Sequence, residues 1–293
     1  MTANLKKILR VVFIGGIICG SFLLSSAQAL EVAQIEPVKN RLIIPPGTSK
    51  SGSIKIYNLS GEPKKIKVYL EDWVYLPICD GTKDFKPGGT TPLSAAKWIT
   101  FLPSELTVPA YGRQMLNYTV KVPSDAKGGH YAVLFFQNYL QEPQKTSEGV
   151  NVNVAVRVAS LFYIEPAGTI DRKVNIDGLK MERQAGKWNI SAKFSNLGNA
   201  DINTKGTFFL IDQKGMVYAR GEFNEVYTFG GDSADLIATW KGAIPDGTYD
   251  LVMTIDISKA LEDAGLGRIP ALTREATLTI SDNGDTVKIG EFK

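Results

Sequence analysis

The stretch Val150–Pro166, VNVNVAVRVASLFYIEP, carries the clearest strand pattern in the chain. Every second residue from Val150 to Val158 is a valine, and smaller or polar residues stand between the valines. Because successive side chains of a β-strand point to opposite faces, this spacing predicts a strand whose valines face a core. The opposite face then carries Asn151, Asn153, Ala155 and Arg157.

Two interpretations of this polar face stay open. It is either the solvated back of a core strand or a surface, along the side or edge of the strand, that another protein contacts. In the second case the partner adds a strand of its own, and main-chain hydrogen bonds supply the affinity. Asn151, Asn153, Ala155 and Arg157 are therefore candidate partner-binding residues.

The rest of the chain alternates in the same way. Residues 53–58, 65–70 and 117–122 have a period of two, and glycine, proline, asparagine and aspartate separate such segments. Many short, half-buried strands with turns between them predict an all-β fold, here two immunoglobulin-like β-sandwich domains in tandem. One exception, residues 258–265, begins with serine and ends with glycine, which predicts a short helix within a connection.

The second half of the chain repeats landmarks of the first. Asn58 and Asn196 begin the similar turns NLSG and NLGN, and Tyr131 and Tyr249 each open an apolar strand after an acidic, glycine-containing turn. This layout predicts tyrosine corners, in which the ring packs inward and the hydroxyl bonds backbone a few residues upstream. The asparagine and the tyrosine are 73 positions apart in the first unit and 53 in the second, which predicts an insertion near Val74–Ile99.

Residues 1–29 have the parts of a secretory signal peptide: a basic start, an apolar run and the small-x-small site AQA. We expect cleavage after Ala29 and a mature protein that is periplasmic, secreted or on the cell surface, without membrane insertion. The mature chain suits two domains of ordinary size. Proline and glycine near position 166 place them at residues 30–166 and 167–293.

The charge balance excludes two classes of partner. Three of the 33 basic residues lie in residues 1–29, which leaves 30 basic residues in the mature chain against 30 acidic ones. A neutral chain without a basic run offers no electrostatic attraction to nucleic acid or to an anionic membrane. We therefore expect other exported or surface proteins as partners, and no nucleic acid.

No set of catalytic residues is visible, so we predict a protein that is not an enzyme and holds no metal or cofactor. His130 is the only histidine, which excludes a histidine-based triad, and its place before Tyr131 predicts a polar turn residue. Glu71 and Asp72 are neighbours in a strand and point to opposite faces, unlike a glycosidase pair. Cys79, the only cysteine after residue 29, lies in a loop where we expect an accessible thiol, either inert, reactive or bridging two molecules.

Several features together resemble a known family. They are RLII at 41–44 before a Pro-Gly turn, a strand ending at Asn58, a tyrosine-glycine pair at 111–112, and AVRVASLFYIEP at 155–166. Residues 35–166 resemble the N-terminal domain of periplasmic pilus-assembly chaperones of the PapD type, whose long last strand ends in a Leu-Phe-Tyr-x-Pro signature. The resemblance implies two immunoglobulin-like domains and donation of this strand to an incomplete pilin subunit.

The resemblance also implies that an arginine and a lysine hold the subunit's C-terminal carboxylate. Arg41 stands at the position of the arginine, whereas Ser160 stands at that of the lysine. Asn151, Asn153 and Ala155 stand where the family donates large apolar side chains. We carry Arg41 forward as a candidate partner-binding residue.

The second half resembles a different group. FSNLGNADINTKGTFFLIDQKGMVYARG at 194–221 looks like the second domain of WxL-interacting cell-surface proteins, which bind WxL proteins, peptidoglycan and host surfaces. The sequence therefore supports two functional hypotheses. The first is a PapD-like chaperone or assembly factor for surface or pilus-like proteins, and the alternative is a structural cell-surface or cell-wall-binding module.

Overall fold

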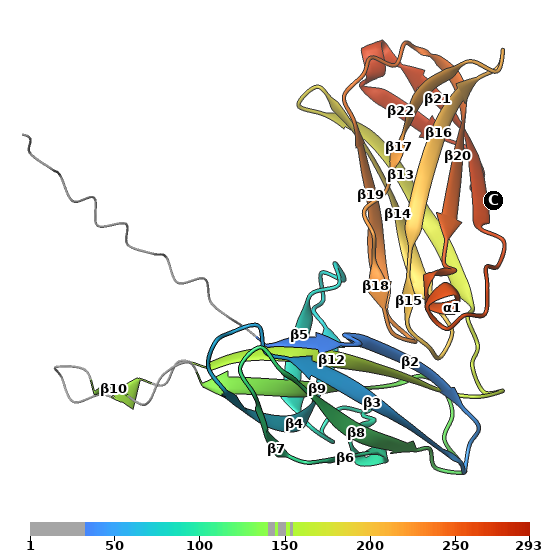
Figure 1. The fold of residues 1–293 in the computed structure, drawn as a ribbon. Helices are drawn as coiled ribbons and strands as arrows, with labels where there is room; N and C mark the ends of the chain where they lie inside the picture. The colour runs from blue at the N-terminus through green and yellow to red at the C-terminus, as the bar shows by residue number, and fades with distance from the viewer. Residues whose placement is uncertain (1–32, 140–143, 146–150, 153–154) are drawn as a thin grey trace, which may run out of the picture. The chain divides into compact units, whose positions relative to one another are not determined.

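The computed structural model describes residues 33–139, 144–145, 151–152 and 155–293 of the chain. Residues 32–293 cluster into one compact unit. Its regular structure consists almost wholly of strands (Figure 1), and they are arranged as two β-sandwiches that follow one another along the chain. The predicted fold class is confirmed.

The first sandwich packs a four-stranded sheet against a larger one. The four-stranded sheet consists of β1 (Gln34–Glu36), β3 (Ser49–Tyr57), β8 (Arg113–Lys121) and β6 (Ile99–Leu102), in that spatial order. The larger sheet consists of β2 (Lys39–Ile44), β12 (Ala155–Pro166), β9 (His130–Tyr139), β4 (Lys64–Tyr75) and β5 (Lys83–Pro87), and β7 (Glu105–Val108) also pairs with β4. The short 3-10 helix η1 (Ala96–Trp98) precedes β6, and β10 (Gln144–Lys145) pairs with β11 (Asn151–Val152).

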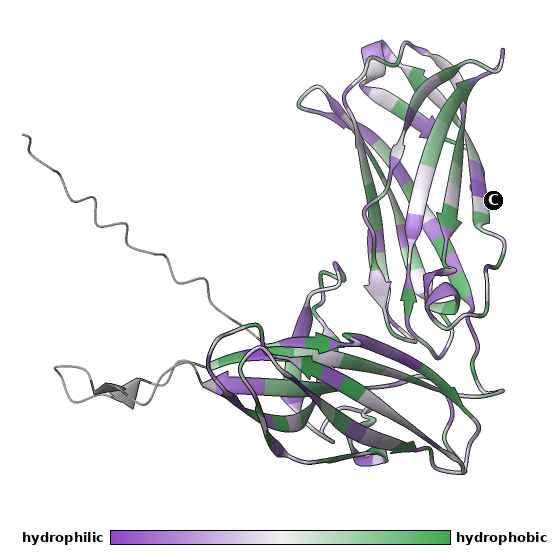
Figure 2. Cartoon of the chain, in the orientation of Figure 1, coloured by the Kyte–Doolittle hydropathy of each residue, from purple (hydrophilic) through white to green (hydrophobic). Residues whose placement is uncertain are grey.

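The core of this sandwich lies between the two sheets. Ala132, Leu134 and Phe136 of β9 face Ile54 and Ile56 of β3 across it, and all of these side chains are buried. The alternation of apolar and polar residues along the strands can be followed in Figure 2. Each large side chain that leaves water in this way stabilises the fold by about 1.5–3 kcal/mol.

The second sandwich has its own core and its own sheets. One sheet consists of β13 (Val174–Gln184), β14 (Lys187–Asn196) and β19 (Ser233–Trp240). The other consists of β17 (Val217–Glu222), β16 (Lys205–Asp212), β20 (Gly247–Asp256), β21 (Leu272–Ser281) and β22 (Thr286–Ile289). A two-stranded pair, β15 (Ile202–Asn203) and β18 (Tyr227–Thr228), and the short helices α1 (Lys259–Asp263) and η2 (Asp282–Gly284) complete it.

The short helix predicted at residues 258–265 is α1. Ser258 precedes it as expected, but its hydroxyl donates to the Ile269 carbonyl at 3.1 Å and does not cap the helix.

The repeated asparagines are equivalent to each other, as the sequence predicts. Asn58 and Asn196 are both buried, and each donates its side-chain amide to a carbonyl four residues later, in Glu62 and Ala200.

The two tyrosines behave differently from each other. The Tyr249 hydroxyl donates to the Pro245 carbonyl at 2.7 Å, which confirms a tyrosine corner in the second sandwich. The prediction for Tyr131 is wrong. Its ring leaves the first sandwich on the face opposite Ala132, and its hydroxyl accepts a hydrogen bond from the Asp201 amide at 2.7 Å, 70 positions downstream.

Candidate functional site: the free edge of strand β12

Strand β12 is paired more completely on one side than on the other. Antiparallel β9 pairs with Ala155–Ile164, whereas parallel β2 pairs only with Leu161–Pro166. The Leu161 amide donates to the Val38 carbonyl at 2.9 Å where β2 begins. Among the residues that the structure describes, no strand pairs with the outer side of Ala155–Ser160. We call this side of Ala155–Ser160 the free edge.

The direction of the main-chain groups at the free edge follows from Leu161. Alternate residues of an antiparallel ladder direct their N–H and C=O groups to the same side. Because Leu161 donates toward β2, Ala159, Arg157 and Ala155 direct their main-chain groups outward as well. At 3.3 Å per residue the free edge is about 20 Å long, and such unpaired groups are a template for another strand.

Buried polar contacts set the point at which the free edge ends. The Ser160 hydroxyl donates to the Pro37 carbonyl at 2.7 Å and accepts from the Asn40 side-chain amide at 2.8 Å. Ser160 is fully buried, so these bonds hold the start of β2 against β12. The position at which the family resemblance implies a lysine therefore holds a small internal hydroxyl that joins two strands.

A hollow of about 540 Å³ adjoins the free edge. It lies between β12 and β1, the edge strand of the other sheet, and its lining is largely apolar. Ile35 forms part of the buried core, whereas Val38 beside it is 61% exposed. Val158 and Ala159 supply the β12 side of the lining. An extended segment added to the free edge would place its side chains beside this apolar hollow.

The candidate residues of the polar face are only partly described. Ala155 is exposed at the start of β12, and Val158 packs partly against the core on the other face, as the alternation predicts. Asn151 belongs to β11, where its backbone pairs with Lys145. Asn153 lies outside the described residues. The structure thus brings only Ala155 and Arg157 together on β12.

Arg157 lies flat on the outer face of the larger sheet. Its guanidinium is 4.0 Å from the centroid of the Phe135 ring, and it donates to the Glu71 carboxylate at 3.2 Å and 3.3 Å. The hydrogen bond to the Tyr69 hydroxyl is the main cause that raises the pKa of Arg157. Glu71 raises it as well, whereas desolvation by burial opposes the shift. Its charge is therefore compensated within the chain, and its aliphatic part covers aromatic surface.

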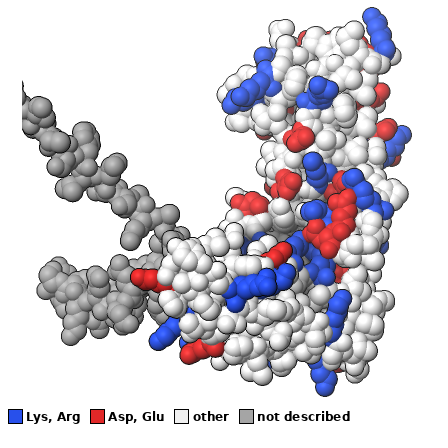
Figure 3. Space-filling model, in the orientation of Figure 1, with Lys and Arg blue, Asp and Glu red and all other residues white. Residues whose placement is uncertain are grey.

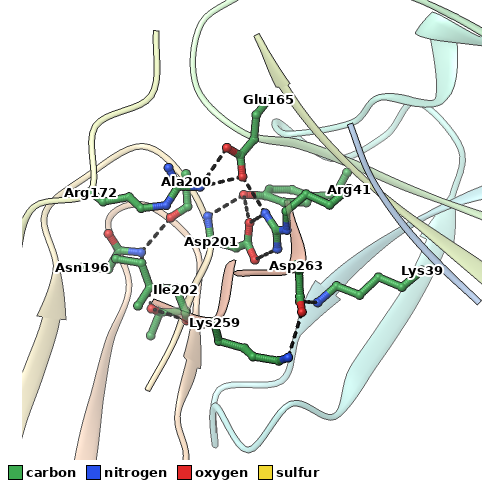
Figure 4. Close-up of polar contacts among 12 residues, drawn as sticks. Lys39, Arg41, Glu165, Arg172, Asn196, Ala200, Asp201, Ile202, Lys259 and Asp263 are labelled. Atoms are coloured by element: carbon green, nitrogen blue, oxygen red, sulfur yellow. Dashed lines mark hydrogen bonds and ion pairs between the residues drawn. The ribbon is translucent and has the colours of Figure 1, made fainter. Parts of the chain in front are cut away.

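Arg41 occupies a buried ion cluster instead of an open site (Figure 4). It donates to both carboxylate oxygens of Asp201, at 2.9 Å and 2.6 Å, and to Glu165 at 2.5 Å. Arg172 donates to the same Glu165 at 2.7 Å and 2.8 Å. The side chain of Arg41 is 1% exposed. Burial would lower the pKa of Arg41, but Asp201 and Glu165 together raise it.

These contacts do not agree with the predicted role of Arg41 as a direct ligand of a partner's carboxylate. The carboxylates that it binds belong to this chain, and a bidentate arginine–carboxylate pair already uses the planar donor face. A foreign carboxylate would have to displace Asp201 or Glu165 and leave it buried without its partner, which costs several kcal/mol. Arg41 instead connects the two sandwiches.

The ion cluster continues into an aromatic cluster. The rings of Tyr131 and Phe229 are stacked with centroids 4.3 Å apart, and Trp73 is 5.2 Å from both Phe229 and Tyr163. The Tyr131 ring is 2% exposed. Aromatic pairs of this kind contribute about 0.5–1.5 kcal/mol beyond the area that they bury. Phe229 and Asp201 of the second sandwich therefore cover Tyr131, which is why Tyr131 cannot form a corner. The rest of the outer face of β9 is covered by side chains of the first sandwich, such as Tyr69 and Phe85.

Further ion pairs lie beside these clusters. Asp263 of α1 pairs with Lys39 of β2 and with Lys259 at 2.8 Å (Figure 4). On the face shown in Figure 3, acidic and basic side chains lie next to each other and form no large patch of one sign. This distribution agrees with the neutral charge of the chain beyond residue 29.

Cys79 and His130 are both more buried than the sequence predicts. Cys79 is 5% exposed, and burial, with Asp232 and Asp80, raises the pKa of its thiol, so the expectation of an accessible thiol is wrong. The His130 ring lies 4.2 Å from that of Trp98, and burial lowers its pKa although the Gly128 carbonyl opposes the shift. The connection after β5 places Trp98 beside the histidine, and nothing in the local sequence pattern indicates this contact.

The carboxylates at positions 71 and 72 diverge as predicted. Glu71 faces Arg157, whereas Asp72 lies on the other face. Asp72 accepts from the Thr90 and Thr91 amides at 2.8 Å and 2.9 Å and from the Ser94 hydroxyl at 2.5 Å.

Within the described residues, no group of three or more histidine, cysteine, aspartate or glutamate side chains is arranged to hold a metal ion. The same part of the chain contains no helix long and apolar enough to cross a membrane.

When the chain is compared with known proteins, only solved structures are found to be similar to it. No protein-family model and no curated protein sequence matches the chain. The class 5 fimbriae chaperone CfaA is similar with a TM-score of 0.47 and 16% identity, covering 83% of this chain and 98% of that one. The CupB2 chaperone of Pseudomonas aeruginosa has a TM-score of 0.38 and 11% identity, with coverage of 83% and 98%.

The CsuC–CsuE complex of chaperone and tip adhesion subunit, from the Csu pili of Acinetobacter baumannii, is similar with a TM-score of 0.42. The identity is 10%, and the similarity covers 83% of this chain and 97% of that one. CfaA is named as a fimbriae chaperone and CupB2 as a chaperone, and the third structure is a complex of a chaperone with a pilus subunit. The strand pairing itself gives the two β-sandwiches that the resemblance implies. The likeness of the second domain to WxL-interacting proteins stays a prediction.

Proposed function

We propose that this protein is an exported, non-enzymatic chaperone or assembly factor of the PapD-like kind, which binds other exported or surface proteins by strand addition. The signal peptide is removed after Ala29, and the mature protein, with domains 30–166 and 167–293, acts in the periplasm or at the cell surface. The partner is an extended segment of another exported protein, hydrogen-bonded to the free edge of β12.

One observation carries this proposal. The outer main-chain groups of Ala155–Ser160 have no strand partner among the described residues, although the same strand is paired on both sides from Leu161 to Ile164. An edge of this length and regularity is a liability unless it is covered, because it pairs readily with other extended chains. An added strand would turn the unpaired groups into main-chain hydrogen bonds.

The hollow beside the free edge indicates where the side chains of the partner go. Its apolar lining consists of Ala33, Ile35, Val38, Val158 and Ala159, and Gln34, Glu36 and Tyr57 also border it. Strand β12 itself offers only small or partly buried side chains there. Large apolar side chains are therefore supplied by the partner and received by the hollow. In this respect the mode of binding differs from the one the resemblance implies, in which the chaperone strand donates them.

The decisive experiment removes one outward N–H group without disturbing the paired side of β12. Ala159→Pro deletes the outward amide, and proline is tolerated at an edge position whose N–H faces solvent. Ala159→Ser is the matched control, because serine keeps the main-chain amide and has a side chain of similar size. Each tagged variant is used to capture partners from the native host, and melting temperatures are measured in parallel.

We expect Ala159→Ser to capture the proteins that the wild type captures and Ala159→Pro to capture none of them, with both variants folded. Equal capture by folded Ala159→Pro and Ala159→Ser would refute strand addition at this edge. The structural cell-surface module would then be the better hypothesis, and binding to purified cell wall would be its first test.

A further inference from the structure

The loop between β4 and β5 is longer than the hairpin requires. Tyr75 and Lys83 are the last paired residues of the two strands, and Leu76–Thr82 connects them. Two residues suffice to join paired antiparallel strands. The additional residues belong to the segment that the sequence marks as an insertion, and strand addition at β12 gives them no role. We call Leu76–Thr82 the strap.

The strap contacts the second sandwich. The Tyr227 amide, at the start of β18, donates to the Cys79 carbonyl at 2.8 Å. The Cys79 sulfur lies 3.6 Å from the Pro77 carbonyl and 4.0 Å from that of Ser233, which begins β19. At the base of the strap, the Tyr75 ring is 4.8 Å from that of Phe229. The main chain of Cys79 therefore contacts β18, and its side chain contacts β19.

Internal hydrogen bonds hold the strap in this conformation. Cys79 has a positive φ of 54°, which is uncommon for a residue other than glycine, and its amide donates to the Leu76 carbonyl at 2.8 Å. The Asp80 carboxylate accepts the Thr82 amide at 2.9 Å, and Lys83 donates to the Gly81 carbonyl at 2.9 Å. A backbone in a sparsely populated region persists where its surroundings determine it, and here it presents the Cys79 carbonyl to Tyr227.

Close packing makes the contact sensitive to one glycine. Gly81 has a φ of +90°, and a Cβ atom placed there would lie 3.0 Å from two carbons of the Tyr227 ring. Such a distance is shorter than ordinary van der Waals contact, so any other side chain at this position would move the strap or the ring. The glycine lets the strap lie directly on Tyr227.

We propose that the strap is a built-in fastening between the two sandwiches, which makes them unfold together and buries the Cys79 thiol while it is closed. Opening of the strap separates Cys79 from Ser233 and exposes the thiol. The accessibility of Cys79 therefore reports whether the strap is closed. This device is independent of the free edge of β12, because β4 and β5 are separated from that edge by β9.

The first experiment compares Gly81→Ala with Gly215→Ala. Gly215 has a similar φ of +84°, but a Cβ atom there would have no neighbour within 4 Å, so this variant carries the backbone strain without the clash. An aromatic disulfide reagent is added to the folded protein, and labelling of Cys79 is followed by peptide mass spectrometry, which distinguishes it from Cys19.

We expect Cys79 to be labelled about tenfold faster in Gly81→Ala than in Gly215→Ala, because reaction of a buried group follows local opening. Gly215→Ala should match the wild type. Equal labelling rates in the two folded variants would overturn the proposal.

The second experiment removes the strap and decides the matter if Gly81→Ala fails to fold. Replacing Leu76–Thr82 by Asn-Gly closes the hairpin between the paired residues Tyr75 and Lys83 with a favoured two-residue turn. Calorimetry should show one transition for the intact chain and either two transitions or a lower midpoint for the variant. A shorter loop alone would not lower the midpoint, since its closure costs less entropy. A single transition at an unchanged midpoint would overturn the proposal.

Discussion

Removing the hydroxyl of Tyr131 should destabilise the protein more than removing that of Tyr249. Tyr131→Phe keeps a ring that is 2% exposed and stacked on Phe229, so the packing is preserved. The change removes the oxygen that accepts the Asp201 amide at 2.7 Å, and it removes a contact with the Asp201 carboxylate at 3.4 Å. Burial, and then Asp201, raise the pKa of Tyr131, so the hydroxyl keeps its proton throughout the assay.

The magnitude follows from the burial of the group that loses its partner. A buried amide left without an acceptor costs about 1–3 kcal/mol. Tyr249→Phe breaks a bond to the Pro245 carbonyl that is only part-buried, so water can replace the phenol and the loss should be about 1 kcal/mol. Guanidinium unfolding followed by circular dichroism measures both. A cost for Tyr131→Phe equal to or below that for Tyr249→Phe would refute the assignment of its hydroxyl to the contact between sandwiches.

Three further outcomes are expected. Arg41→Ala should lower the free energy of unfolding by about 3–5 kcal/mol, because it leaves Asp201 and Glu165 buried without their shared cation; a loss below about 1 kcal/mol in urea unfolding would contradict this. Burial opposes ionisation of Asp72, but the Ser94 hydroxyl and neighbouring amides lower its pKa below 3.8, so its stabilisation is complete above about pH 4 and is lost as the pH falls further. Asp72→Asn should flatten this acid-induced decline in denaturation curves. Burial lowers the pKa of His130 below 6.5, so stability should fall as the pH drops from about 7 to 5, and His130→Gln should abolish that slope.

Much of the fold could be predicted because its signals are local. Alternation with a period of two at residues 53–58 identifies a strand that the structure extends to Ser49–Tyr57. The turn before Tyr249 places the corner within a few residues. Both depend on neighbours in the chain, as does the short helix α1. The equivalence of Asn58 and Asn196 could be predicted for the same reason, since each side-chain amide bonds a carbonyl four residues away.

Tyr131 shows where the local pattern is insufficient. It follows the same kind of turn as Tyr249, yet it faces away from its own core because Phe229 and Asp201 of the second sandwich receive its ring and its hydroxyl. One signal was present in the sequence. Residues 132–136 are apolar at every position, and a strand without alternation is typically buried on both faces. The run predicts that something covers the outer face, but it does not identify the cover.

At the candidate site, the local pattern predicts a strand and its residue types, whereas the contacts of these residues depend on segments far away in the chain. Alternation predicted a strand over Val150–Val158, and in the structure β12 begins at Ala155. Its unpaired edge exists only because β2 begins opposite Leu161. The sequence singled out Arg41 as a residue for a carboxylate, and it does bind carboxylates. They are those of Glu165 and Asp201, 124 and 160 positions away. A hydrogen bond acts over about 3 Å in space and does not depend on how far apart its partners are in the sequence. Only the folded chain therefore determines which carboxylates lie beside Arg41.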